Sequence, residues 1–557
     1  MTAENTGAAD KQRLPVDAAP GSWEAGLAAR IARDGDKWAN TTIALEAWKK
    51  ARDCPDRVAI FLEDAPDATY GELAEDARRL ITAFQGLGLK AGDVVSFQLP
   101  NWREAVPIDI AAAALGLVVN PIVPIYRGAE LAYILKDAAT RVFFIPDQFR
   151  SINYVETVAG LREDLPALQH VVTVRASADY PGCVRFEQLM SSEPADIDSL
   201  PPVDPNWPKC RLYTSGTTGF PKAVLHSHNT LNYIQGCSIR HSGISADDVM
   251  VMPSPVTHIT GYSSGINMAF MSEGRAALMP RWDADAAIDY IHRVKGTMTV
   301  GATPFLVELL DAADRRGDGL PSLRQFSCGG AGVPPQLVRR AYQVLENCIT
   351  VRVYGSTEVP MVSYGWRDNP ELAATTDGHL FAFEVRILDD DGNEVAAGEE
   401  GEIAARGPGM MLGYADPEQN AQAHTADGFF LTGDIGRITA EGAVLITDRK
   451  KDIIIRGGEN LSAKEIEDAL HHHPAIKEAA VVAMPHERLG EGVCAVVIAA
   501  PGAAAPDLES VARFTDERGL ARQKIPEKLV LVDDLPRTPS GKVRKDILRK
   551  QLKEGEL

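Results

Sequence analysis

The chain has 557 residues, of which 45% are hydrophobic and 24% are charged, a balance typical of a globular protein with several domain-sized units. Its formal net charge of −20 argues against nucleic acid or an anionic membrane surface as the main partner. The seven cysteines form no CxxC pair, which argues against disulfides and structural zinc and favours reduced thiols in the cytoplasm.

Residues 1–40 are expected to form an N-terminal extension that is partly disordered, and the first residues lack the apolar run of a signal peptide. The most apolar stretch, residues 108–125, is interrupted by Asn120, Pro121 and Pro124. No integral membrane segment is therefore expected.

Apolar strand-like runs alternate with helical patterns from residue 94 onward, which predicts a parallel, doubly wound α/β sheet. A second block of the same kind lies between about residues 229 and 355. The expected strands are 94–99, 142–145, 298–300 and 350–353, and the expected helices are 103–115, 130–138, 284–294 and 334–345.

Between residues 378 and 448 the helical patterns give way to short strands with Asp-Gly and Gly-Glu turns, which predicts the hairpins of an antiparallel sheet or barrel. After the charged segment DRKKD, residues 448–452, helices and strands return, which predicts a separate α+β domain. We therefore expect a large domain over 41–448 and a small domain over 449–557.

The stretch YTSGTTGFPKAV, residues 213–224, combines glycines, small hydroxyl residues and a lysine. Glycine lets backbone N–H groups turn toward an anion, hydroxyls add donors, and a lysine adds positive charge. The spacing differs from GxxxxGK[ST], so this phosphate-binding loop is not a P-loop. The residues expected to bind phosphate are Thr214, Ser215, Gly216, Thr217, Thr218, Gly219 and Lys222.

Four further segments follow: YGSTE (354–358), LTGD (431–434), DRKKDIIIRGGEN (448–460) and LPRTPSGKVRK (535–545). With these motifs in this order, the chain resembles the adenylate-forming superfamily of acyl-CoA synthetases, aryl-CoA ligases, luciferases and peptide-synthetase adenylation domains. The resemblance extends from about residue 40 to 550. One departure is Ala223, where most members have glycine.

The resemblance implies a large N-terminal domain of two doubly wound sheets and a distorted β-barrel, closed by a small mobile α+β domain. It also implies ATP, Mg²⁺ and coenzyme A as ligands. Glu358 would hold Mg²⁺, because a carboxylate beside a polyphosphate needs a divalent ion between them. The further residues expected at the nucleotide are Gly330, Ala331, Tyr354, Gly355, Ser356, Thr357, Asp434 and Arg449.

Lys542 matches the family's adenylation lysine, which would bridge the acid carboxylate and the α-phosphate and offset the repulsion between two anions. Lys451 matches the hinge about which the small domain rotates. Gly457 and Gly458 match the loop that lines the tunnel for the pantetheine of CoA. The catalytic residues expected on this basis are Lys542, Thr217, Glu358 and His258.

His258 matches the family position that gates the acyl pocket. The other residues expected to line this pocket are Gly261, Gly329, Gly330, Val359 and Pro360. The segments around these positions, residues 258–265, 329–332 and 359–361, contain no lysine, arginine or tryptophan. This composition predicts an acid with one carboxylate and an apolar body.

The predicted function is an ATP-dependent, AMP-forming carboxylate–CoA ligase acting on a hydrophobic monocarboxylate, of alicyclic, medium-chain or steroid side-chain type. In the segments SFQLPNW (96–102), NPIVPIYR (120–127) and LHSHNTL (225–231), the chain resembles the cyclohexanecarboxylate–CoA and fatty-acid–CoA ligases. Two alternatives stay open: an adenylation enzyme that loads a carrier protein, and an acyl-adenylate sensor without turnover. A homodimer is compatible with the sequence.

The segment GYSSG, residues 261–265, also fits the GxSxG pattern of serine hydrolases. It lacks a convincing preceding strand, and the family places a helix there. A serine hydrolase is therefore disfavoured.

Overall fold

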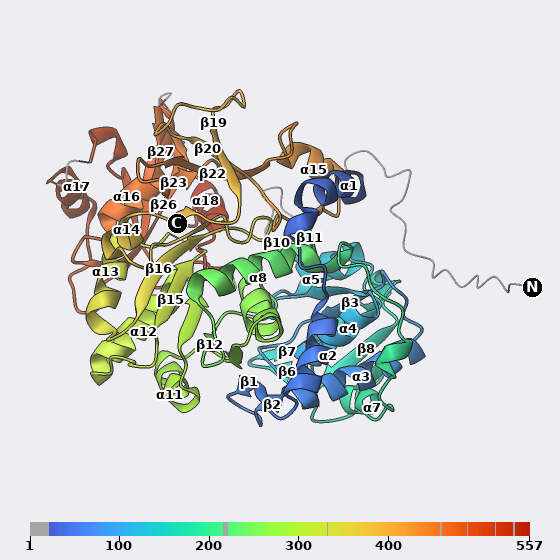
Figure 1. Ribbon diagram of the computed structural model, residues 1–557. Helices are drawn as coiled ribbons and strands as arrows, with labels where there is room; N and C mark the ends of the chain where they lie inside the picture. The colour runs from blue at the N-terminus through green and yellow to red at the C-terminus, as the bar shows by residue number, and fades with distance from the viewer. Residues whose placement is uncertain are drawn as a thin grey trace, which may run out of the picture.

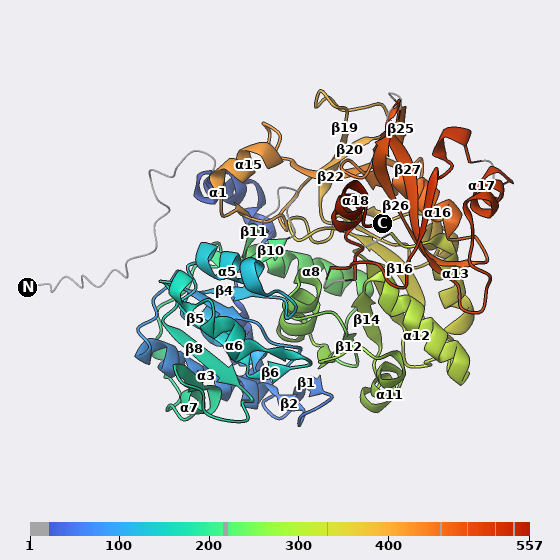
Figure 2. The ribbon, with the colours of Figure 1, turned by 180° about the vertical axis from the view of Figure 1, so that it is seen from behind.

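The computed structural model describes residues 22–214, 221–330, 332–456, 459–486, 488–517, 520–538 and 541–557. The two largest sheets, of nine and eight strands, are both mixed (Figure 1). The C-terminal elements, drawn in orange to red, lie over the end of the molecule formed by the second sheet and a smaller antiparallel sheet (Figures 1 and 2).

The first sheet has eight strands in the order β21-β11-β10-β4-β3-β5-β8-β9, and the six from β10 to β9 are parallel. Its central strands β3 and β5 are fully buried and rich in valine and phenylalanine, as expected where helices cover both faces. The strands are β3 Val94–Phe97, β4 Val118–Pro121, β5 Val142–Pro146, β8 His170–Val174, β9 Cys183–Arg185, β10 Pro208–Thr214, β11 Lys222–Ser227 and β21 Gly413–Tyr414.

The helices near the first sheet include α4, which is buried all round, as the absence of polar residues other than Asp109 predicts. A short hairpin of β6 Gln148–Phe149 and β7 Ile152–Asn153 follows β5. The helices are α2 Ile43–Asp53, α3 Tyr70–Gly86, α4 Ala105–Ala114, α5 Gly128–Asp137, α6 Tyr154–Ala159, η2 Arg162–Asp164, α7 Phe186–Met190, η3 Ile197–Ser199 and α8 His228–Ser242.

The second sheet has nine strands in the order β18-β17-β16-β15-β14-β12-β13-β1-β2, with a parallel centre from β16 to β1 and antiparallel edges. Its strands are β1 Val58–Leu62, β2 Ala68–Thr69, β12 Val249–Met252, β13 Arg275–Leu278, β14 Met298–Gly301, β15 Gln325–Gly329, β16 Ile349–Tyr354, β17 Ser363–Tyr364 and β18 His379–Leu380. Its helical segments are α9 Ile259–Gly261, η4 Tyr262–Asn267, α10 Met268–Met271, α11 Ala284–Val294, α12 Thr303–Arg316, α13 Pro335–Val344 and α14 Pro370–Thr375.

The region expected as a distorted barrel forms a four-stranded antiparallel sheet in the order β19-β20-β22-β23. The prediction that helices are missing from 378–448 is wrong, because Asp416 caps a short helix, α15 Pro417–Ala423, with proline in its first turn. The strands are β19 Glu384–Leu388, β20 Gly401–Arg406, β22 Phe430–Ile438 and β23 Val444–Arg449.

The C-terminal domain has a five-stranded sheet in which β26 and β27 form a long hairpin, β24 and β28 pair with β27, and β25 pairs with β24. Two core clusters occupy this domain. Its elements are β24 Ile454–Arg456, β25 Glu459–Leu461, α16 Ala463–Leu470, β26 Ile476–His486, β27 Gly490–Ala499, α17 Leu508–Glu517, η5 Arg522–Lys524, β28 Lys528–Leu531 and α18 Lys545–Glu554.

Part of the N-terminal extension is folded, as α1 Trp23–Asp34 and η1 Gly35–Lys37. The buried Arg30 guanidinium donates to the carbonyls of Met410 and Met411, and the Trp38 indole donates to the carbonyl of Pro408 at 3.1 Å. These bonds attach the extension to the segment just before β21.

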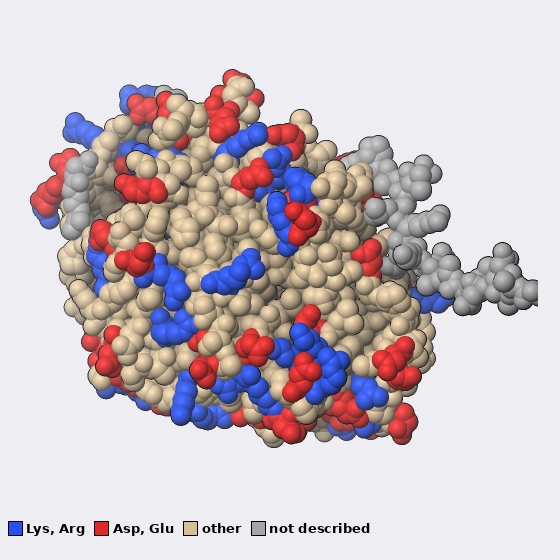
Figure 3. Space-filling view, viewed as in Figure 1, with Lys and Arg blue, Asp and Glu red and all other residues tan. Residues whose placement is uncertain are grey.

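Among the residues that the structure describes, no helix is long and apolar enough to cross a membrane. On the face shown in Figure 3, acidic and basic side chains are interspersed, with no continuous basic surface.

Candidate active site

A cavity of about 840 Å³ lies at the carboxyl ends of the parallel strands β12, β14, β15 and β16, the edge at which open α/β sheets bind ligands. Its wall also includes residues from β10, β11, β22, β23 and the C-terminal domain. The sheets and both domains therefore contribute to one site.

One part of the cavity, which we call the charged end, is lined by Lys222, Glu358, Arg449 and Lys542, with Asp434 directly behind Arg449. Asp434 and Arg449 are cross-strand neighbours of β22 and β23, and the guanidinium Nε lies 2.9 Å from the carboxylate. The Tyr354 hydroxyl, at the end of β16, donates to the other Asp434 oxygen at 2.9 Å. Asp434 raises the pKa of Arg449, so this guanidinium is a permanent cation in the wall.

Glu358 is nearly buried, and one of its oxygens accepts a hydrogen bond from the Tyr414 hydroxyl at 2.9 Å. The ammonium of Lys222 lies 4.9 Å from the centre of the Tyr414 ring. Lys222 in turn faces Thr214 across the β10–β11 hairpin. Tyr414 therefore links the lysine and the carboxylate. The sequence motifs did not predict this role, because Tyr414 lies on β21, outside all of them.

The donor set fits Mg²⁺ held mainly by phosphate oxygens. The described residues contain no cluster of three or more metal-binding side chains, so they form no all-protein cage. Glu358 offers one carboxylate whose second oxygen accepts no hydrogen bond from a described residue. One carboxylate completed by substrate oxygens and water is a usual magnesium arrangement.

The YGSTE segment is held by a tight turn, in which the Ser356 amide donates to the Val359 carbonyl at 3.0 Å. The buried His226 donates from Nε2 to the Thr357 carbonyl at 2.6 Å, and burial lowers the pKa of His226 to about 4. A neutral imidazole thus fixes the position of Thr357. His226 is a further residue that the motifs did not single out.

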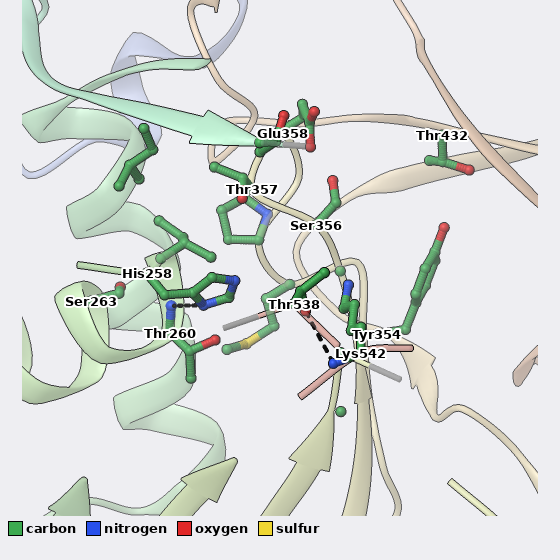
Figure 4. A pocket seen from close by; sticks show the side chains of 18 of the residues that line it. His258, Thr260, Ser263, Tyr354, Ser356, Thr357, Glu358, Thr432, Thr538 and Lys542 are labelled. Atoms are coloured by element: carbon green, nitrogen blue, oxygen red, sulfur yellow. Dashed lines mark hydrogen bonds between the residues drawn. The ribbon is translucent and has the colours of Figure 1, made fainter. Parts of the chain in front are cut away.

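Lys542 enters the cavity from the C-terminal domain, after Thr538, whose hydroxyl accepts from the Lys542 amide at 3.1 Å (Figure 4). Burial, together with the nearby Arg449, lowers the pKa of Lys542 to about 8. A Cβ built on Gly330 would lie 3.7 Å from Lys542 Cε, so the lysine stem passes over the end of β15. The ammonium is desolvated and close to the charged end.

The opposite part, which we call the α8–η4 end, is lined by His258, Ile259, Thr260, Ser263 and Ser264, with Gln235 from α8. Figure 4 shows His258, Thr260 and Ser263 on one side of the cavity, Tyr354 and Thr432 on the other, and Thr538 and Lys542 between them.

His258 Nδ1 accepts from the Thr260 amide at 3.4 Å, which leaves the proton on Nε2. Burial and the nearby Lys542 lower the pKa of His258 to about 4, so the imidazole is neutral at pH 7.

The α8–η4 end is anchored from behind by a buried triad of Lys209, Asp109 and Tyr262, the first residue of η4. The Lys209 ammonium lies 2.9 and 3.0 Å from the two Asp109 oxygens and 2.5 Å from the Tyr262 hydroxyl, which also donates to Asp109. The side chains of Lys209 and Asp109 are 2% and 0% exposed. The triad joins β10, α4 and the π-helical turn η4, an irregular element often found at functional sites.

Two residues predicted for the acyl pocket lie outside the cavity wall. Val359 is fully buried in a core cluster with Tyr354. A Cβ on Gly261 would lie 2.1 Å from the Pro255 carbonyl oxygen, so this glycine permits a close backbone contact and creates no cavity space. Gly329 does line the cavity. A Cβ there would lie 2.2 Å from the Val353 carbonyl oxygen, so close backbone packing requires a glycine at this position too.

The cavity wall contains Thr214, Lys222, His258, Gly329, Gly330, Tyr354, Gly355, Ser356, Thr357, Glu358, Pro360, Arg449, Lys451 and Lys542 among the predicted residues. Asp434, Gly261 and Val359 are described but do not line the cavity. The other predicted positions lie outside the described residues, namely Ser215, Gly216, Thr217, Thr218, Gly219, Ala331, Gly457 and Gly458.

Comparison with known proteins agrees with this geometry. The model of the AMP-binding enzyme family matches residues 47–415, and that of the AMP-binding enzyme C-terminal domain matches residues 465–542. The chain belongs to the AMP-binding enzymes.

Similar proteins include a medium-chain fatty-acid–CoA ligase of Escherichia coli K12, 34% identical over 92% of this chain and 91% of that one. A salicyl-AMP ligase/salicyl-S-ArCP synthetase of Mycobacterium tuberculosis is 32% identical, over 98% and 97% of the two chains. The crystal structure of ATP-bound MatB from Rhodopseudomonas palustris superimposes with a TM-score of 0.82 at 28% identity, covering 93% of this chain and all of that one.

This AMP-binding enzyme is an acid–thiol ligase, which activates a carboxylic acid as its adenylate. ATP and CoA are the co-substrates of such ligases. The two-sheet architecture and the C-terminal domain expected from the resemblance are confirmed.

Proposed function

We propose that the enzyme joins a hydrophobic monocarboxylic acid to coenzyme A in two steps, through an acyl-adenylate. The observation that carries the proposal is the position of Lys542. Its ammonium comes from the C-terminal domain into the same cavity as Glu358 and Arg449. A desolvated cation at this place offsets the repulsion between an acid carboxylate and a phosphate as they approach each other.

In the first step, Thr214 and Lys222 bind the β- and γ-phosphates together with the loop between them. Asp434 accepts hydrogen bonds from the ribose hydroxyls, Arg449 contacts the ribose and phosphate, and Tyr354 packs on the adenine. Glu358 would hold Mg²⁺, which would supply positive charge beside the phosphates. Lys542 aligns the carboxylate for attack on the α-phosphate, and pyrophosphate leaves.

In the second step, the C-terminal domain rotates about Lys451, which withdraws Lys542 and brings Gly457 and Gly458 to the pantetheine tunnel. Lys451 lies in the cavity wall two residues after the last residue of β23, a suitable place for a hinge between the domains. The CoA thiolate then attacks the acyl-adenylate carbonyl.

The acid has an apolar body of alicyclic, medium-chain or steroid side-chain type. Ile234, Ile259, Val300, Ala302, Pro360 and Met361 supply apolar surface to the cavity. None of the cavity residues from α8, α9 or η4 is a lysine or arginine, so a second carboxylate would lack a partner there.

The similarity to a salicyl-S-ArCP synthetase favours a second candidate, the transfer of the acyl group to a carrier protein. Acid-dependent ATP–pyrophosphate exchange tests adenylation, and acyl-CoA formation on addition of CoA tests the acceptor. Exchange without acyl-CoA would replace the CoA ligase by the carrier-loading enzyme. The absence of exchange with every acid of a broad screen would leave the acyl-adenylate sensor.

A further inference from the structure

The α8–η4 end of the cavity contains a polar pair that an entirely apolar substrate would not require. Gln235, on α8, donates from its amide nitrogen to the Ser263 hydroxyl oxygen, on η4. The two residues are 2% and 5% exposed, yet both line the cavity. They are shielded from bulk solvent and face whatever occupies this end.

The hydrogen bond between them leaves several polar groups unused. The side-chain amide of glutamine has two N–H donors and one carbonyl acceptor, and a serine hydroxyl can donate as well as accept. Among the described residues, none donates to the Gln235 carbonyl, and none accepts the Ser263 hydroxyl proton. The neighbouring Ser264 hydroxyl, also in the cavity wall, has no hydrogen-bond partner among the described residues. Exchanging the oxygen and nitrogen of the amide still leaves one of its groups facing the cavity.

An apolar acid that filled this end would remove water from these groups and would form no hydrogen bonds with them in its place. A hydroxyl or carbonyl group on the substrate would satisfy them, because it can pair with both amides and hydroxyls. A second carboxylate is a poorer match, since no cation from α8, α9 or η4 reaches the cavity.

We propose that the acid carries a hydroxyl or carbonyl group on its apolar body, remote from the reacting carboxylate, and that Gln235 and Ser263 bind this group. The inference rests on the proposed function, because it assigns the α8–η4 end to the acid. It makes Gln235 and Ser263 determinants of specificity that act on binding of the substrate.

The test compares acids that share a skeleton and differ only in the polar group. We would measure kcat/KM for acyl-CoA formation with cyclohexanecarboxylate, its 4-hydroxy and 4-oxo derivatives, octanoate and 8-hydroxyoctanoate. In the unmodified enzyme, at least one polar acid should exceed its parent by about tenfold or more. Gln235→Leu should lower that ratio at least about tenfold, and Ser263→Ala by about threefold or more.

The ratio of two acids on one enzyme preparation does not depend on the fraction that is folded, so partial misfolding cannot imitate the result. Asn232→Leu is the matched control. Asn232 lies one helical turn earlier on α8, donates to the Thr41 carbonyl at 2.9 Å and does not line the cavity. This variant should keep the ratio of the unmodified enzyme.

A parent acid that equals or exceeds its polar derivatives in every pair would overturn the inference and leave the CoA ligase intact. So would a ratio that neither Gln235→Leu nor Ser263→Ala changes, because the pair would then only hold α8 against η4. No acyl-CoA from any acid would overturn the proposed function, and the inference with it.

Discussion

The charged end and the α8–η4 end of the cavity differ in how their side chains are held. At the charged end, Arg449 and Tyr354 line the cavity, and both are bonded directly to Asp434 behind them. At the α8–η4 end, the main ion pair lies behind the wall, between Lys209 and Asp109, and only neutral groups face the ligand. A cavity for a constant anion needs charges in contact with it, whereas a cavity for a variable organic group needs a rigid wall with exchangeable side chains.

The largest effect should come from Lys542→Ala. This change removes the cation at the charged end that we propose acts in adenylation and is withdrawn before thioester formation. We expect acid-dependent ATP–pyrophosphate exchange to fall by about a thousandfold, or about 4 kcal/mol of transition-state stabilisation. Thioester formation from preformed acyl-adenylate should change little, because the two anions no longer meet in that step.

Lys550→Ala is a suitable control, because Lys550 lies on α18, in the same domain, with a side chain that is 73% exposed. Equal loss of both half-reactions in Lys542→Ala would contradict the role assigned to this lysine.

The second prediction concerns the wall of the α8–η4 end. Lys209→Met should lower the free energy of unfolding by about 3 kcal/mol, because Asp109 and the Tyr262 hydroxyl are left buried without the cation. Thermal unfolding of the purified variant measures this loss. Lys550→Met breaks an exposed pair with Glu554 and should cost at most about 0.5 kcal/mol.

Replacing both charges, in Asp109→Leu with Lys209→Met, should recover part of the stability, since no unpaired charge then remains. If Lys209→Met alone unfolds at the temperature of the unmodified enzyme, the triad does not anchor η4.

The sequence predicted the charged end better than the α8–η4 end, and the reason is local. Tyr354, Asp434, Arg449 and Lys542 lie in contiguous motifs whose spacing is visible in the chain, and all but Asp434 line the cavity. The two large sheets could be predicted equally well from the sequence, because their buried strands alternate with helices along the chain.

Gln235, Ser263 and Tyr414 come from α8, η4 and β21, and only the packing of these elements brings them to one cavity. Gly261 and Gly329 were both predicted to line the acyl pocket, but a sequence does not show which backbone approaches a glycine, and only Gly329 lines the cavity. In the structure, the backbone carbonyl of Pro255 lies against Gly261 and that of Val353 lies against Gly329.

The third prediction compares acids of different size on the unmodified enzyme. Cyclohexanecarboxylate, octanoate and benzoate should exceed acetate and succinate in kcat/KM by about 30-fold or more, because each buried methylene contributes about 0.8 kcal/mol. All five are measured under the same conditions. Preference for acetate or succinate over the three larger acids would show that side chains fill the α8–η4 end.

The smallest effect is a change of rate with pH at the charged end. Lys542 acts as a cation, and burial lowers its pKa to about 8, so it loses its charge as the pH rises through that value. The kcat/KM for ATP–pyrophosphate exchange, which reports the free enzyme, should therefore fall about tenfold for each pH unit above 8. His258, with a pKa of about 4, is neutral throughout this range and adds no second step. Bound ATP and acid are anions that stabilise the ammonium, so kcat should decline only at higher pH.

Lys542→Arg should abolish the alkaline decline at whatever activity it retains, because a guanidinium stays charged. A profile of the unmodified enzyme that stays flat to pH 9.5 would contradict both the lowered pKa and the need for charge at this position.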